Sequence, residues 1–290
     1  MKCNICGLVC LESVECREQV ESFYASSEYR SMPTIQVLSP EEHFNDHVLS
    51  QDVRKRLEFI ASEIEIAGAR ILEVGSASGR LLETLGRLGA RKVVGVELDQ
   101  TFSSFAERRG LRILTRPIEE LELQDEFDLV VIFHTLEHVF SPMSTIRAIY
   151  RALARGGCFL GEVPNQRDWR IEIFNDEIAK RFHFDPAHRH YFDSESLGNY
   201  LQRCGFEGSR FETIERYDSL AQLRNILGKR EPGVSVEDVL RKHIFPKDDA
   251  DEMRLQNPRD PVAARFNALF SKAVNSELMG NCLRWVAWKN

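Results

Sequence analysis

The stretch RILEVGSASG, residues 70–79, decides the fold of this 290-residue chain. Its first half, residues 70–74, is an apolar run that predicts a buried strand, and the glycines at 75 and 79 predict a tight turn that opens a helix. Beyond it, short β-branched runs alternate with helical stretches, a pattern typical of a parallel sheet covered by helices on both faces. Such a turn, at the carboxyl end of a strand, is where these sheets hold nucleotide-like ligands.

The periodicity predicts the order of the elements along the chain. We expect strands over 70–74, 92–97, 111–114, 127–133, 158–163, 206–217 and 282–288, and helices over 79–88, 102–109, 143–154 and 194–204. Regularity fails after Pro164, and a second charged, proline-containing stretch follows Ser219. We therefore expect an N-terminal segment over 1–60 that carries cysteines and helices, and a ligand-binding domain over 61–290. Two insertions in that domain, 165–193 and 219–260, are expected to cover the substrate.

Composition narrows the class of function. The chain has 38 Lys and Arg residues against 45 Asp and Glu residues, and its formal net charge of −7 gives no general attraction for nucleic acids or anionic membranes. The N-terminus lacks the apolar segment of a signal peptide, and no apolar run is long enough to span a bilayer. We expect a cytoplasmic protein with a small-molecule substrate and no nucleic-acid partner, and the sequence leaves the oligomeric state open.

The glycine spacing in the turn distinguishes between two ligands. A dinucleotide fingerprint that begins at Gly75 requires glycines at 77 and 80, where this chain has Ala77 and Arg80, so the spacing disfavours NAD. The pattern ExGxxxG instead lets the backbone approach an uncharged nucleoside and its amino-acid tail, as in S-adenosylmethionine. Glu97 follows at the tip of the second strand, where a carboxylate can accept hydrogen bonds from both ribose hydroxyls.

Over residues 69–206 the sequence resembles the class I S-adenosylmethionine-dependent methyltransferases. The resemblance is carried by ILEVGSASG, GVELD, TRPIEEL, FDLVVIFHTLEHVFSP and LARGGCFLGEVPN. It implies an α/β, Rossmann-like sheet that is mostly parallel, with the last strand antiparallel, helices on both faces, and helical insertions. The cofactor-binding residues that we expect from the turn and from this resemblance are Glu73, Gly75, Ser76, Ala77, Gly79, Glu97, Leu98, Ile118, Phe133 and His134.

Within that family the segment HRHYFDSESLGNYLQRCGFE resembles methyltransferases of sugar and glycan biosynthesis. The resemblance implies a sugar or glycan-precursor acceptor. Methyl transfer from a sulfonium ion is an in-line displacement, so the protein must hold the acceptor and remove its proton. We predict His190, at the end of the first insertion, as the base; the alternative is a structural histidine that holds the insertion in place. Sugar carbon methyltransferases have Glu before this His, whereas this chain has Arg189, which argues against carbon methylation.

Two other functions remain open. Histidines and an acid could bind a metal ion and loosely resemble the small-RNA 3′-end 2′-O-methyltransferases, although His134 replaces the second acid of their motif and the net charge disfavours RNA. The residues concerned are His134, Glu137, His138, His183, His188 and His190. For Glu137 and His138 we expect packing roles, and we predict no catalytic metal. The third function is a protein that binds S-adenosylmethionine without catalysis.

The N-terminus carries four cysteines, Cys3, Cys6, Cys10 and Cys16. Cys3 and Cys6 resemble one knuckle of a small zinc module found before some sugar methyltransferases, but the other knuckle is missing and the remaining spacing is irregular. We therefore expect little or no zinc. Two tyrosines, Tyr24 and Tyr29, together with Arg30, follow where that family places aromatic residues over the cofactor; an amphipathic helix that packs one face explains them equally well.

Overall fold

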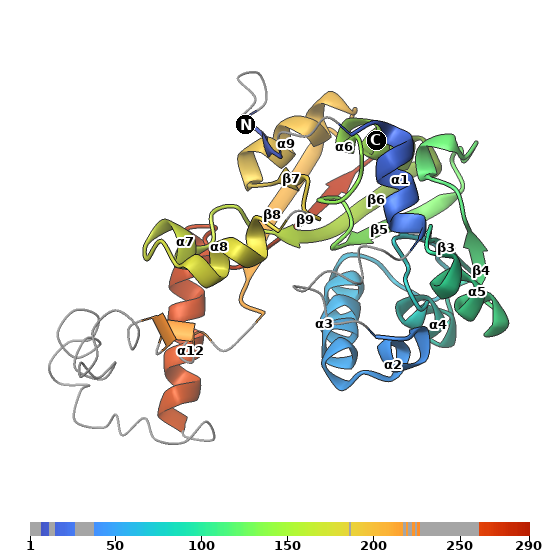
Figure 1. The fold of residues 1–290 in the computed structure, drawn as a ribbon. Helices are drawn as coiled ribbons and strands as arrows, with labels where there is room; N and C mark the ends of the chain where they lie inside the picture. The colour runs from blue at the N-terminus through green and yellow to red at the C-terminus, as the bar shows by residue number, and fades with distance from the viewer. Residues whose placement is uncertain are drawn as a thin grey trace, which may run out of the picture. The chain divides into compact units, whose positions relative to one another are not determined.

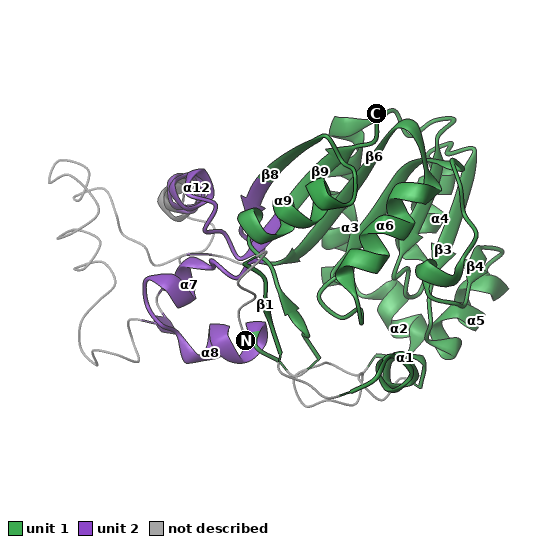
Figure 2. Cartoon of the chain, turned by 90° about the horizontal axis from the view of Figure 1, so that it is seen from above, with its two compact units in different colours: residues 1–164, 184–211, 284–290 green, residues 165–183, 212–283 purple. Residues whose placement is uncertain are grey.

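The computed structural model describes residues 7–11, 15–26, 38–185, 187–216, 219, 222–223, 225–226 and 261–290, except for the side chains of 261–266. The chain divides into two compact units (Figure 2). Unit 1 contains residues 1–164, 184–211 and 284–290, and unit 2 contains residues 165–183 and 212–283. The segment expected as one insertion over 165–193 is therefore shared between the units, and most of the second insertion, 219–260, lies outside the described residues.

A seven-stranded sheet in the order β4-β3-β2-β5-β6-β9-β8 organises the fold (Figure 1). The strands are β2 (Arg70–Val74), β3 (Lys92–Val96), β4 (Arg112–Leu114), β5 (Phe127–Phe133), β6 (Leu153–Pro164), β8 (Gly208–Ile214) and β9 (Cys282–Trp288). Strands β4, β3, β2, β5 and β6 pair in parallel. Strand β9 is antiparallel to β6, because Gly156 N donates to Lys289 O at one end and Asn165 N donates to Asn281 O at the other. The predicted fold class is confirmed.

The central strands are buried on both sides. In β5 the four residues from Leu129 to Ile132 are 0% exposed, as expected of a parallel strand between two helical layers. The helices are α2 (Pro40–Asn45), α3 (His47–Glu63), α4 (Arg80–Arg87), α5 (Gln100–Arg108), α6 (Pro142–Ala152) and α9 (Ser194–Arg203). Phe59 and Ile60 of α3 and Leu85 of α4 join Ile71 and Leu129 in one apolar cluster, which places α3 and α4 over the same face of the sheet.

The largest difference from a predicted boundary lies between α6 and β6. We expected a helix over 143–154 and a strand from 158, but α6 ends at Ala152 and β6 begins at Leu153. The register against β5 shifts between Leu153 and Cys158, which form an irregular start to the strand. Gly156 has φ +77°, and a Cβ on Gly157 would lie 2.9 Å from the Ala154 carbonyl oxygen, so these two glycines permit the bulge.

Several further elements have bounds that the sequence did not predict. They are β1 (Val9–Cys10), α1 (Arg17–Ala25), the 3-10 helix η2 (Ile118–Glu120), α7 (Trp169–Glu172), α8 (Glu177–His183), β7 (His190–Tyr191) and α12 (Pro261–Ser276). Strands β1 and β7 form a separate antiparallel pair, with Cys10 opposite His190. None of the helices in the described part of the chain combines the length and hydropathy that a membrane crossing requires.

Candidate functional site

The turn after β2 has the backbone geometry that the sequence predicted. Gly75 and Gly79 have φ values of +78° and +75°, and Ala77 between them has φ +45°. A Cβ on Gly75 would lie 2.1 Å from Thr135 Oγ1, so only glycine lets this turn approach the segment that follows β5. The ends of the adjacent strands β2 and β5 are thereby brought together at the edge of the sheet where such folds bind ligands.

Glu97, at the end of β3, is bonded to this turn. Its Oε2 accepts a hydrogen bond of 2.8 Å from Ala77 N, and its Oε1 accepts one of 2.9 Å from Asp99 N. A carboxylate has about four acceptor positions, so one group can accept hydrogen bonds from a turn and from a ligand together. The carboxylate therefore both supports the turn and can receive the ribose. Leu98 follows it, half-buried, and Ile118 in η2 is 2% exposed.

Buried polar atoms without a hydrogen-bond partner among the described residues gather near this turn. They are Glu73 Oε2, Ser76 Oγ and Arg56 Nε. Burial raises the pKa of Glu73 to about 8, although the nearby Arg56 lowers it, so the carboxyl is largely protonated at neutral pH. Because buried polar groups are normally satisfied, these atoms indicate where a polar ligand belongs.

Arg56 is a candidate residue that the sequence reasoning missed. Its guanidinium carbon lies 4.7 Å from the centroid of the Phe133 ring, and its Nη2 lies 3.7 Å from Glu162 Oε1. Its side chain is only 15% exposed. Arg56 follows Val53 by three positions and precedes Ile60 by four, so it lies on the apolar face of α3. The signal in the sequence was a charged residue on the apolar face of a predicted helix, because such residues are rarely buried without a partner.

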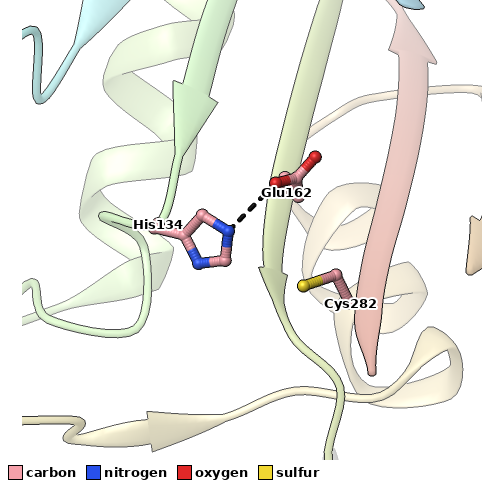
Figure 3. Close-up of side chains that lie close together, drawn as sticks. All are labelled: His134, Glu162 and Cys282. Atoms are coloured by element: carbon pink, nitrogen blue, oxygen red, sulfur yellow. Dashed lines mark hydrogen bonds and ion pairs between the residues drawn. The ribbon is translucent and has the colours of Figure 1, made fainter. Parts of the chain in front are cut away.

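The segment after β5 begins with a strained residue. His134 has φ +48°, and its Nε2 lies 3.0 Å from Glu162 Oε1 on β6 (Figure 3). Arg284 Nε donates to the other oxygen, Glu162 Oε2, at 2.8 Å. Burial opposes ionisation of Glu162, but contacts with His134, Arg56 and Arg284 hold its pKa well below the usual range. An ionised carboxylate thus fixes the His134 ring next to Phe133, and both residues are among those expected to bind the cofactor.

A second cluster lies further along the same segment. Ligand-type atoms of Glu137, His138 and His188 lie within 4.8 Å of one another. Glu137 is 1% exposed, and neither of its carboxylate oxygens has a hydrogen-bond partner among the described residues. The nearest basic nitrogens are His134 Nδ1 at 3.5 Å and His138 Nε2 at 3.9 Å from Glu137 Oε1. Burial alone would raise the pKa of Glu137, but His134, His138 and His188 lower it to about 2.

The backbone fixes the tautomer of His138. Its Nδ1 lies 2.9 Å from the Ala187 carbonyl oxygen, which can only accept, so Nδ1 carries the proton and Nε2 keeps the lone pair. Burial lowers the pKa of His138, which keeps the ring neutral at pH 7. Its side chain is 21% exposed, so an acceptor can approach. We expected Glu137 and His138 only to pack, but their arrangement is also suited to proton transfer or metal binding.

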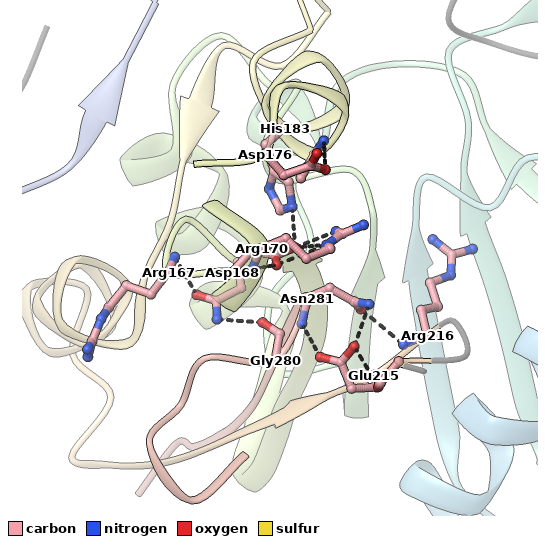
Figure 4. A network of polar contacts seen from close by, with 12 residues as sticks. Arg167, Asp168, Arg170, Asp176, His183, Glu215, Arg216, Gly280 and Asn281 are labelled. Carbon is pink, nitrogen blue, oxygen red and sulfur yellow. Dashed lines mark hydrogen bonds and ion pairs between the residues drawn. The ribbon is translucent and has the colours of Figure 1, made fainter. Parts of the chain in front are cut away.

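The other predicted histidines lie differently. His190 Nε2 lies 3.0 Å from the Val139 carbonyl oxygen, and Nδ1 is buried from solvent. Burial lowers the pKa of His190 to about 4. The ring is therefore neutral, but its lone pair is enclosed, and His190 remains a predicted base without a visible route to an acceptor. His183 belongs to unit 2, where its Nε2 lies 2.9 Å from Asp168 Oδ2 (Figure 4).

The structure describes only part of the N-terminal predictions. The structure describes Cys10 and Cys16, whereas Cys3 and Cys6 lie outside the described residues, so the zinc expectation stays a prediction. Tyr24 lies in α1, and its hydroxyl is 3.2 Å from His138 Nδ1. Tyr29 and Arg30 lie outside the described residues.

Comparisons with known proteins show the family of this chain. A family model described as a methyltransferase domain matches residues 42–209. A ubiquinone biosynthesis O-methyltransferase of Nitrosococcus oceani is 38% identical over 186 residues, which cover 60% of this chain and 78% of that protein. Its counterpart in Xanthomonas oryzae pv. oryzae is 36% identical over 110 residues, covering 35% of this chain and 46% of the relative, so this chain spans less than half of that relative's length.

Solved structures show the same fold at low sequence identity. Haemonchus contortus phosphoethanolamine N-methyltransferase 2, in complex with S-adenosyl-L-methionine, superposes with a TM-score of 0.57 at 15% identity, covering 96% of this chain and 60% of that one. An S-adenosylmethionine-dependent methyltransferase from Archaeoglobus fulgidus gives a TM-score of 0.55 at 18% identity, covering 86% and 97%.

Proposed function

Because the chain belongs to the methyltransferase-domain family and is an S-adenosylmethionine-dependent methyltransferase, we propose that it methylates a hydroxyl oxygen of a small molecule. The observation that carries the proposal is the geometry after β5, where His138 Nδ1 lies 2.9 Å from the Ala187 carbonyl oxygen and His138 Nε2 lies 3.9 Å from Glu137 Oε1. A hydroxyl is a weak nucleophile, so its methylation requires a group that takes its proton.

We place the nucleoside at the ends of β2 and β3. Glu97 would accept from the ribose hydroxyls, Ile118 and Leu98 would flank the adenine, and the turn from Gly75 to Gly79 would approach the cofactor by its backbone. The close approach of Gly75 to Thr135 and the bond from Ala77 N to Glu97 support this placement, because they order the turn before any ligand binds.

The amino-acid end of the cofactor would lie toward Glu73 and Arg56. Both carry a buried polar atom without a hydrogen-bond partner among the described residues. The guanidinium of Arg56 complements an α-carboxylate, and the carboxyl of Glu73 complements an α-ammonium once the ligand ionises it. The Glu162 carboxylate holds His134 beside them. A bound zwitterion would satisfy atoms whose burial is otherwise costly.

We propose His138 as the base, with Glu137 stabilising the imidazolium that forms when His138 takes the acceptor proton. His190 then supports the base. Its backbone N and that of Arg189 both donate to the Glu137 carbonyl oxygen, at 3.1 and 2.8 Å, and its ring contacts the Val139 carbonyl oxygen, so it orders the segment that carries Glu137 and His138. The original assignment of His190 as the base itself stays a prediction.

The acceptor is proposed only as a small molecule with a hydroxyl group. The relatives are named O-methyltransferases of ubiquinone biosynthesis, which supports oxygen methylation and lends no support to the narrower expectation of a sugar or glycan precursor. The net charge of −7 continues to argue against a nucleic-acid acceptor.

A metal-assisted reaction is the second candidate, because both oxygens of the buried Glu137 lack a hydrogen-bond partner among the described residues. One carboxylate and two imidazoles form a donor set that fits a divalent transition-metal ion, and Glu137, His138 and His188 would hold it. When bound, such an ion would act as a Lewis acid that favours the alkoxide form of the acceptor. The Ala187 carbonyl would orient His138 for this role as well.

The test is to incubate the full-length protein with methyl-labelled S-adenosylmethionine and cell extract fractionated into small molecules, protein and RNA. We expect label in a small-molecule fraction, lost in Glu97→Ala. Label in RNA, or binding of the cofactor without transfer to any fraction, would contradict the proposed acceptor or the catalytic role. Repeating the assay after chelation and after adding back Mn²⁺ or Zn²⁺ separates the two candidates, since only the metal-assisted reaction loses activity with the ion.

A further inference from the structure

Helix α1 lies outside the residues that match the family model, yet its side chains contact the proposed site at two places. In its first turn, Arg17 Nη2 lies 3.4 Å from Glu120 Oε1 in η2, the short helix that carries Ile118. In its last turn, Tyr24 contacts His138. Between these contacts Val20 is 4% exposed. One nine-residue helix therefore connects the proposed adenine side with the proposed acceptor side.

The Tyr24 hydroxyl joins three segments of the chain. It donates to the Ala187 carbonyl oxygen at 2.7 Å and lies 3.2 Å from His138 Nδ1, while Nδ1 itself lies 2.9 Å from the same carbonyl oxygen. A carbonyl oxygen has two lone pairs and can accept from both donors, and the phenol oxygen can share the Nδ1 proton. The rings of Tyr24 and His138 are also packed together, with centroids 5.5 Å apart.

The segment that offers this carbonyl is itself held in place. Asp185, 5% exposed, accepts from Ala187 N through Oδ1 at 2.9 Å, and its backbone oxygen accepts from His188 N at 2.8 Å. This turn presents Ala187 O toward Tyr24 and His138, and it places the His188 ring 5.0 Å from the His138 ring. A change at Tyr24 would therefore act on both imidazoles through one hydrogen-bonded turn.

From these contacts we propose that Tyr24 is a positioning residue of the methyl-transfer site, which fastens α1 over the bound cofactor and holds His138 with Nε2 toward Glu137. The inference rests on the proposed cofactor site and deepens it. Burial raises the pKa of Tyr24 well above its usual range, so the phenol stays protonated and keeps its donor role at any physiological pH. Release of the cofactor then requires the bonds of this hydroxyl to break.

The experiment measures the dissociation rate of S-adenosylhomocysteine from full-length parent, Tyr24→Phe and Tyr150→Phe proteins by stopped flow. Tyr150 lies in α6 and packs against Phe206, so its substitution removes a hydroxyl elsewhere in the same unit. We expect dissociation about 10-fold faster in Tyr24→Phe, from the loss of two hydrogen bonds, and no change in Tyr150→Phe. Turnover with an acceptor should also fall about 10-fold in Tyr24→Phe, with little change in the KM for that acceptor.

A purely structural role would lower Tm in Tyr24→Phe but leave dissociation unchanged well below the melting temperature, and that result would overturn the proposal. Should Tyr24→Phe fail to fold, Val20→Ala tests the same helix without altering the hydroxyl, and dissociation about 5-fold faster is expected from its looser packing. Unchanged dissociation in Val20→Ala would count against the role of α1. A parent protein that does not bind S-adenosylhomocysteine would instead refute the proposed cofactor site, and with it the proposed role of Tyr24.

Discussion

Replacement of Glu97 by alanine should weaken the binding of S-adenosylmethionine by about 1.5 to 3 kcal/mol, the usual contribution of a hydrogen bond to a charged group. That loss corresponds to a Kd about 10- to 150-fold higher. The carboxylate is fixed before any ligand arrives, because Ala77 N and Asp99 N donate to its two oxygens at 2.8 and 2.9 Å. Little ordering energy is therefore required for it to receive the ribose.

The same substitution should also destabilise the unliganded protein, because Ala77 N loses its acceptor. The cost of leaving such a group unsatisfied is about 1 to 3 kcal/mol, or a fall in Tm of about 2 to 10 °C. Calorimetric titration and thermal unfolding of the same samples separate the two effects. Glu126→Ala is the control, since Glu126 pairs with Lys92 at the amino ends of β5 and β3. Unchanged cofactor affinity in Glu97→Ala, or tight NAD binding by the parent, would refute the assignment of the ribose site.

Three further outcomes are expected. Because burial raises the pKa of Glu73 to about 8, binding of S-adenosylhomocysteine near pH 7 should release up to one proton as the ligand's ammonium group ionises the carboxyl, and affinity should rise with pH up to about 8. Calorimetry in buffers of different ionisation enthalpy measures this proton release. A binding heat that does not depend on the buffer, or a proton release that persists in Glu73→Gln, would contradict the expectation. His138→Gln should lower turnover by about 100-fold or more at unchanged cofactor affinity, and His190→Gln by less; the reverse order would restore His190 as the base. In unit 2, burial raises the folded-state pKa of Glu215 from 4.5 to about 7, so its contribution to stability is complete below pH 4.5 and is lost as pH rises through 7, by at most about 3 kcal/mol. Denaturant unfolding at low and high pH should show this loss of stability in the parent and not in Glu215→Gln. The same pH dependence of stability in both proteins would contradict the expectation.

The sheet could be predicted from sequence because its central strands are buried on both faces and read as continuous apolar runs, as in β5. The start of β6 could not, since the two glycines that permit a bulge are also a common signal for the end of a helix. The two-residue strands β1 and β7 are too short to leave any periodic pattern.

The cofactor residues from Glu73 to Gly79 and at Glu97 and Leu98 could be proposed from sequence because they belong to one strand-turn-helix unit and the end of the strand beside it. Ile118, Phe133 and His134 were proposed from the family resemblance. The cluster around His138 could not be proposed from sequence, because it depends on contacts between distant segments: His138 and Ala187 are 49 positions apart, and Tyr24 and His138 are 114 positions apart. His190 was chosen for its position at the end of an insertion, but the Val139 carbonyl oxygen, which the sequence does not place, occupies its ring nitrogen. The histidines in the sequence indicated which segments form the site, but not which atoms their rings contact.

The central claim is that the cofactor binds at the ends of β2 and β3, beside η2. The most direct test is hydrogen exchange of the full-length protein with and without S-adenosylhomocysteine, followed by mass spectrometry. We expect protection on binding at 75–79, at Glu97 to Asp99 and around Ile118, and none of it with NAD. Protection elsewhere in the chain, or the same protection with NAD, would contradict the claim.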